Sequence, residues 1–155
     1  MNKRGFTLVE FLVALSIFSL FAVMTFQAYR NWQRQVQLIN ATDNLKSTLL
    51  RAQQLAAAAA ESEAWGVHLD SQEYVLFKGL AFNQTDPTNK VVALSGVQIL
   101  NPATSLSDGQ GGSSADAIFN EGTGQTVNSG TISLQAVFDA ASIKIITIQT
   151  TGRVD

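Results

Sequence analysis

Cysteine is absent from this chain of 155 residues, and histidine occurs once, as His68. Without cysteine there is no disulfide framework, no thiol nucleophile and no cysteine-based zinc site. His68 stands between Val67 and Leu69 in a short alternating stretch, which is typical of a strand and favours a structural or surface role. The sequence therefore predicts neither an enzyme nor a protein that holds a cofactor.

Glycine and proline are missing from the whole interval between Gly5 and Gly66, although the chain has 11 glycines and 2 prolines. Because these two residues are the main helix breakers, the interval predicts one continuous helix from about Phe6 to about Glu63. In its second half, apolar and small residues recur at spacings of three, four and seven, which indicates one buried face. That stripe comprises Leu38, Leu45, Leu49, Ala52, Ala56 and Ala59.

Charge is scarce in the first part of this predicted helix. From Phe6 to Phe26, Glu10 is the only charged residue. These 21 residues would span about 30 Å as a helix, the thickness of the hydrocarbon core of a bilayer. An ordinary secretory signal peptide has a shorter apolar core and a small-x-small cleavage site, which is missing here. A retained membrane helix is favoured, and basic residues on both sides leave its orientation open.

Glu10 is the residue of this segment that needs an explanation. A charged side chain at membrane depth costs roughly 2.5–3.5 kcal/mol on insertion scales, and such residues usually have a partner. One interpretation is that Glu10 pairs with a cation inside an assembly. The other is that its side chain snorkels to the lipid headgroups.

The stretch Gly5-Phe6-Thr7-Leu8-Val9-Glu10 resembles the processing site of type IV pilins and of the pseudopilins of type II secretion. The resemblance implies that a prepilin peptidase cuts after Gly5 and that Phe6 becomes the N-methylated N-terminus. It also implies that Glu10 is the carboxylate needed for assembly. Pairing between Glu10 and the new ammonium of a neighbouring subunit would be stronger in a low-dielectric environment than at a surface.

The resemblance also implies an organisation for the chain. Residues 1–5 would be the prepilin leader, residues 6–28 the transmembrane and filament-core helix, and residues 29–155 a pilin-like globular domain. The chain would be a single-pass protein of the bacterial inner membrane, with its N-terminus cytoplasmic and its C-terminal domain periplasmic or extracellular. Its expected partners are the prepilin peptidase, other pilin or pseudopilin subunits, an inner-membrane assembly platform and the lipid bilayer.

After Gly66 the apolar pattern changes to that of strands. Residues 65–69 and 74–77 read as a hairpin, and residues 91–94 and 97–100 as two strands or one interrupted strand. A loop-rich region over 101–130 holds a possible short strand at 117–119. A second hairpin follows, with strands at 131–138 and 142–149 and a turn at 139–141. We expect an α+β fold in which the long helix packs on a C-terminal antiparallel sheet.

Three further segments resemble the GspH/FimT-like group of minor pseudopilins and minor pilins, namely residues 49–56, 65–69 and 146–154. The chain departs from many major pilins by having no proline near Gln27 and no C-terminal disulfide. The missing proline implies a straighter helix. The missing disulfide fits a minor subunit of a type IV pilus or a type II secretion pseudopilus, and it also fits organisms that avoid secreted disulfides. The particular machine and the filament neighbours stay open.

The loop at residues 108–114 superficially suggests a phosphate or calcium site. It lacks the Lys-Ser/Thr pair of a P-loop and the spaced acids of an EF-hand. Asp108, Asp116 and Glu121 are the candidate ligands if the region binds Ca²⁺ through loop carbonyls as well. A plain flexible loop is the favoured interpretation, so we expect no metal.

DNA binding, as in FimT-like proteins that take part in DNA uptake, is the main alternative function. It would need a basic face for the phosphates. Beyond residue 35 the chain has six basic residues against eleven acidic ones, and no basic cluster is visible in the sequence, although Lys144 and Arg153 could converge in space. Nucleic acid is therefore not an expected partner. A membrane protein that never assembles would leave Gly5, Phe6 and Glu10 unexplained.

Overall fold

The computed structural model describes residues 7–155. Gly5 and Phe6, the predicted cleavage position and new N-terminus, lie outside the described residues. The chain divides after Arg34 into two compact units, the second of which is residues 35–155.

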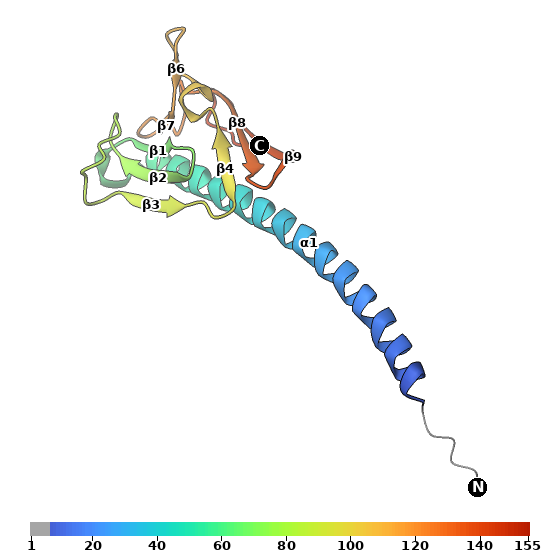
Figure 1. The fold of residues 1–155 in the computed structure, drawn as a ribbon. Helices are drawn as coiled ribbons and strands as arrows, with labels where there is room; N and C mark the ends of the chain where they lie inside the picture. The colour runs from blue at the N-terminus through green and yellow to red at the C-terminus, as the bar shows by residue number, and fades with distance from the viewer. Residues whose placement is uncertain (1–6) are drawn as a thin grey trace. The chain divides into compact units, whose positions relative to one another are not determined.

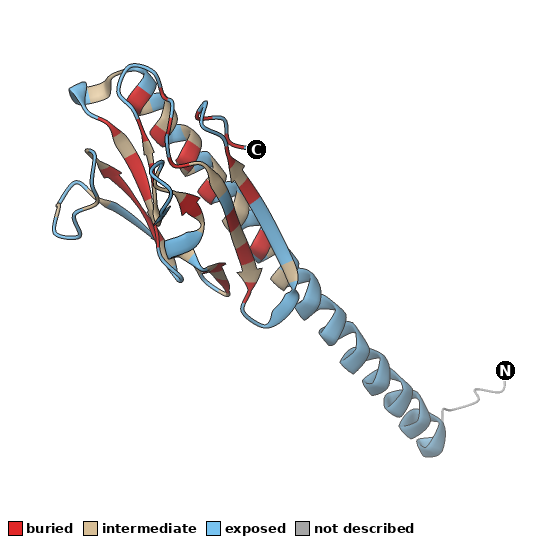
Figure 2. Ribbon diagram, turned by 90° about the horizontal axis from the view of Figure 1, so that it is seen from above, coloured by how far each residue is buried: buried red, intermediate tan, exposed pale blue. Residues whose placement is uncertain are grey.

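Helix α1 runs from Leu8 to Ala57 and so extends through both units (Figure 1). Its residues 8–33, all in the first unit, are exposed (Figure 2). In the second unit one face is buried, and Leu45, Leu49, Ala52 and Ala56 have no exposed surface. The predicted apolar stripe is thereby confirmed from Leu38 to Ala56.

The helix ends earlier than the sequence predicts, at Ala57 rather than near Glu63. Ala59, Glu61 and Ser62 have positive φ angles, and a short 3-10 turn, η1, covers Ala60–Ser62. The main-chain N–H of Gly122 donates to the carbonyl of Ala56 at 2.8 Å. The break at this point overrides the high helix propensity of the alanine run, so tertiary packing decides where the helix stops.

The first antiparallel sheet has the strand order β3-β2-β1-β7. Its strands are β1 (Trp65–Leu69), β2 (Glu73–Lys78), β3 (Lys90–Ala93) and β7 (Asp116–Phe119). The predicted hairpin at 65–77 and the short strand at 117–119 are both confirmed. β7 pairs antiparallel with β1, far back in the sequence.

The second antiparallel sheet has the order β4-β8-β5-β6, with β9 on the other side of β8. Its strands are β4 (Val97–Leu100), β5 (Leu106–Ser107), β6 (Ser113–Ser114), β8 (Gly130–Ala136) and β9 (Asp139–Ile148), and a 3-10 turn, η2, covers Pro102–Thr104. The expectation of a single sheet was thus wrong, because the strands form two sheets. The predicted hairpin forms, but it turns at residues 137–138, because β9 already begins at Asp139.

The hydrophobic core lies between the buried face of α1 and the inner faces of both sheets. Alternate residues of strands such as β1 and β8 point into it, as the buried positions Val67 and Leu69 of β1 and Ile132 and Leu134 of β8 show. All four residues of β3 are exposed. The fold class is α+β, with one long helix packed on antiparallel sheets.

Candidate functional site

The first unit presents an apolar helix surface that nothing in the described chain covers. Large side chains from Leu8 to Phe26 are all at least half exposed, with Leu8 at 76% and Phe18 at 73%. By length and composition, α1 is able to cross a membrane. Exposed apolar surface on this scale requires lipid or other protein chains around it.

Glu10 lies in the first turn of α1 and interacts with Thr7. The Glu10 N–H donates to the Thr7 hydroxyl at 3.3 Å, and the Thr7 N–H and hydroxyl donate to the Glu10 carboxylate at 3.4 and 3.3 Å. This is a capping box, in which the two residues satisfy each other's free N–H groups at the helix start. Our sequence reasoning missed Thr7, although the Thr-x-x-Glu pattern is its signal.

The hydroxyl groups further along the apolar segment also have partners within the helix. Ser16 donates to the carbonyl of Val13 and Ser19 to that of Ser16, both at 2.8 Å, and Thr25 donates to that of Phe21 at 2.9 Å. The segment therefore presents no unpaired hydroxyl donor at these three positions to an apolar environment.

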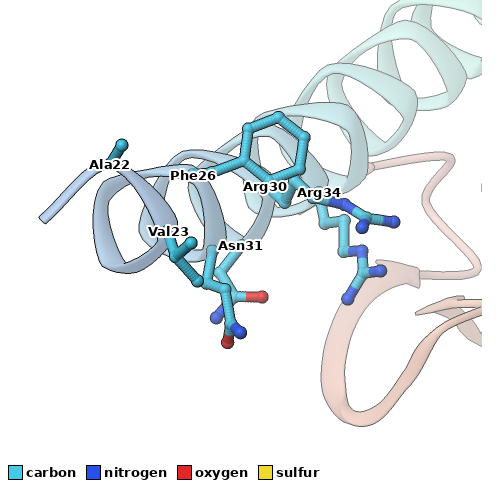
Figure 3. A pocket seen from close by; sticks show the side chains of 7 residues that line it. Ala22, Val23, Phe26, Arg30, Asn31 and Arg34 are labelled. Carbon is cyan, nitrogen blue, oxygen red and sulfur yellow. The ribbon is translucent and has the colours of Figure 1, made fainter. Parts of the chain in front are cut away.

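At the end of the apolar segment, aromatic and basic side chains replace aliphatic ones. The rings of Tyr29 and Trp32 lie 6.0 Å apart, and the Arg30 guanidinium lies 5.8 Å from the centre of the Phe26 ring. An open groove of about 530 Å³ follows this side of the helix (Figure 3). Aromatic and basic residues of this kind are typical of the boundary between lipid and water. The groove is lined by Ala22, Val23, Phe26, Gln27, Arg30, Asn31 and Arg34.

In the second unit, His68 has a structural setting. Its Nδ1 lies 2.5 Å from Oδ1 of Asp116, and its ring stacks on Phe82 with the centroids 4.0 Å apart. Phe82 also contacts Phe77 edge to face. These contacts attach the segment after β2 to the outer side of the first sheet, as expected of a histidine with a structural role.

The candidate calcium ligands are not brought together. Asp116 pairs with His68, while Oδ1 of Asp108 accepts the N–H groups of Gln110 and Gly112 at 2.7 and 2.8 Å. These N–H groups lower the pKa of the Asp108 carboxyl. Within residues 7–155 no three His, Cys, Asp or Glu side chains form a group that could hold a metal, and Asp108, Asp116 and Glu121 are thus not part of such a group.

Two of the basic residues of the second unit are paired with acidic ones. Lys78 pairs with Glu61 at 2.9 Å, which raises the pKa of Lys78, and Arg153 pairs with Asp155 at 2.8 Å. The second unit has six basic residues in all, the others being Lys46, Arg51, Lys90 and Lys144, against eleven acidic residues. This charge distribution gives no support to a phosphate-binding face.

Comparison with known families finds a match at the N-terminus. The model of the prokaryotic N-terminal methylation motif matches residues 1–26, which include Gly5, Phe6 and Glu10. No curated protein matches the chain.

Comparison with solved structures finds similar folds. The type IV minor pilin FimU of Pseudomonas aeruginosa has a TM-score of 0.55 at 12% identity, over 76% of this chain and 90% of FimU. The minor pseudopilin EpsH from the type 2 secretion system of Vibrio cholerae has a TM-score of 0.54 at 15% identity, over 77% of this chain and 94% of EpsH. A second structure of EpsH gives the same score at 14% identity.

Proposed function

We propose that this chain, which joins a prokaryotic N-terminal methylation motif to a pilin-like fold, is a structural subunit of a type IV pilus or of a type II secretion pseudopilus. The motif and the fold support the type IV pilin and pseudopilin superfamily with its GspH/FimT-like minor members. We expect a minor subunit, since FimU and EpsH are both minor components of their assemblies.

One observation carries this proposal. The methylation motif stands directly before a helix whose apolar side chains are exposed from Leu8 to Phe26. A subunit needs such a surface twice, first in the membrane and then against the helices of its neighbours. A soluble binding module would not need it.

The proposed processing follows from the match over residues 1–26. A prepilin peptidase would cut after Gly5 on the cytoplasmic side of the inner membrane, and Phe6 would be methylated. The second unit would then face the periplasm or the exterior. An assembly platform in the inner membrane and other pilin or pseudopilin subunits would be the later partners.

Glu10 would act after that cut. We propose that its carboxylate pairs with the ammonium of Phe6 on a neighbouring subunit as the chain enters the filament. The contact with Thr7 gives the carboxylate a local partner before assembly. The pairing would then set the register of each new subunit along the filament axis.

Mass spectrometry of the native protein tests the processing step. We expect a chain that begins at methylated Phe6, and an intact chain in cells that lack an active prepilin peptidase. A Gly5→Leu variant should stay unprocessed, whereas a control Asn2→Ala variant should be cut. An intact Met1 in cells with an active peptidase would contradict the proposal.

A further inference from the structure

Strand β9 pairs with β8 along one edge, and its other edge is only partly paired. Near the end of β9, Thr147 exchanges two main-chain hydrogen bonds with Asp155, at 3.1 and 2.9 Å. The Gln149 N–H donates to the carbonyl of Arg153 at 2.9 Å, and the bridge between Ile148 and Val154 is antiparallel. This edge of β9 therefore already accepts an extended antiparallel segment of the chain.

The same edge is open further back, at Ile143 and Ile145. Because residues alternate in a strand, these two direct their main-chain groups to the same side as Thr147. Within the described chain, β9 pairs with β8 and, at Ile148, with Val154, and no further main-chain hydrogen bond is found for Ile143 or Ile145. Their side chains are also exposed, at 45% and 61%. An unpaired, apolar edge of this kind is a template for another strand.

There is also space beside this edge. A groove of about 280 Å³ lies between α1 and β9, with Gln35, Leu38 and Ile39 on the helix side. On the strand side it is lined by residues 141–144. Every lining residue belongs to the second unit.

The chain has a second open edge, on β3 at the end of the first sheet (Figure 1). The Leu94 N–H donates to the Gln72 carbonyl at 2.7 Å, so the alternate residues Val91 and Ala93 direct their main-chain groups away from β2. All four residues of β3 are exposed, with Val91 at 58%. β3 thus matches β9 in presenting two outward apolar residues at the same spacing.

We propose that the open edge of β9 binds the open edge of β3 from a second copy of this chain, in antiparallel register. Ile145 would lie opposite Val91, and Ile143 opposite Ala93, so that both cross-strand pairs are apolar on one face. The occupant is a second copy because β3 is itself such a strand: short, apolar and unpaired on its outer side.

The two edges are different surfaces of one chain, so the contact is heterologous and repeats from copy to copy. It joins only two residues of each strand, so the area that it buries is far less than the roughly 800 Å² per partner of a stable interface. The contact is therefore weak for chains free in solution. It would form more often between chains held side by side in a membrane, because their effective concentration is higher there. This inference goes beyond the proposed function, because it rests only on residues of the second unit.

The absence of cysteine makes a direct test possible, since introduced cysteines are the only thiols. Full-length Ile145→Cys and Val91→Cys chains carrying different tags are co-expressed, and their membranes are oxidised with copper phenanthroline. We expect a mixed disulfide dimer several-fold above that of Thr131→Cys with Val91→Cys, since Thr131 is exposed but lies on β8. A yield no higher than this control overturns the proposal, as does equal dimer formation by Ile145→Cys alone.

Two further variants test the register. Ile143→Lys, added to the Ile145→Cys chain, places a charge on the open edge and should reduce the cross-link to the control level. Lys90→Glu, added to the Val91→Cys chain, should increase it, because residue 90 would lie diagonally across from Lys144. Far-UV circular dichroism checks that each variant folds. An unchanged cross-link with Ile143→Lys overturns the proposal.

The N-terminal mass of the same samples separates this inference from the proposed function. Processing at Gly5 without the cross-link would reject only the edge contact. The cross-link on an unprocessed chain would support the edge contact while rejecting the processing.

Discussion

Under the proposed function, Glu10 would have two partners at different stages. In the single chain it caps its own helix together with Thr7. A side-chain cap of this kind stabilises a helix by about 1 kcal/mol, so it offsets part of the cost of the charge near lipid. Under the proposed function, the charge itself, rather than the cap, is what the neighbouring ammonium recognises.

Variants at Thr7 and Glu10 separate these two roles. Glu10→Gln keeps a hydrogen-bond acceptor for Thr7 but removes the charge, and should reduce incorporation into filaments about tenfold or more, the effect of ~1.4 kcal/mol. Thr7→Ala removes the cap and keeps the charge, and should reduce incorporation by less. The measurement is the amount of subunit in sheared filaments relative to membranes. A loss with Thr7→Ala and little or none with Glu10→Gln would assign Glu10 to the cap alone.

Tyr74 gives a prediction about pH. Burial raises its pKa above the ordinary value of 10, while a hydrogen bond with Thr48 opposes the shift. The unfolded chain therefore loses this proton first as the pH rises, so the free energy of unfolding should fall above pH 10. Tyr74→Phe should flatten that part of the profile, measured by urea unfolding between pH 9 and 10.5. A profile as steep as that of the native chain would contradict the assignment.

At the scale of single residues, local patterns were informative and distant pairs were not. The Thr-x-x-Glu cap can be read directly from the sequence. It was missed because the charge of Glu10 in an apolar segment suggested a partner on another subunit rather than within its own helix. His68 and Asp116 are 48 positions apart, and no local pattern links them. Only the pairing of β1 with β7 brings them together.

At the scale of elements, the helix and the hairpins were predictable because their signals are local. The stripe from Leu38 to Ala56 defined the buried face of α1. The end of the helix was not predictable, because the alanine run favours helix while contacts with the distant loop at Gly122 stop it. The division into two sheets was missed for the same reason: β3 and β4 are both short and mostly apolar, and long-range pairing assigns them to different sheets.

The buried face of α1 should dominate the stability of the second unit. Leu49 has no exposed surface, so Leu49→Ala removes apolar contacts and leaves a cavity, at a cost of about 2–5 kcal/mol. Leu80 is 74% exposed, and Leu80→Ala should change the free energy of unfolding by no more than about 0.5 kcal/mol. Urea unfolding of the full chain in detergent measures both. Similar losses would mean that α1 does not anchor this core.

At the scale of the whole molecule, the two units should behave differently toward membranes. The full chain should stay with membranes after alkaline carbonate extraction, because its exposed apolar helix is long enough to span them. A chain that begins at Gln35 should be released into the supernatant, since its apolar residues are largely buried in the core. Release of the full chain would contradict a membrane-spanning segment.

The hydroxyl groups of Ser16, Ser19 and Thr25 have a consequence for how the first unit changes surroundings. Each already donates to a carbonyl of its own helix. Moving the segment from lipid to a bundle of other helices would then break no hydrogen bond at these positions, and moving it back would break none either. Under the proposed function, the hydrogen bonds in the middle of the segment would therefore favour neither the lipid nor the filament. The first turn, at Thr7 and Glu10, would be the part of the segment whose polar contacts differ between a subunit in the membrane and a subunit in the filament.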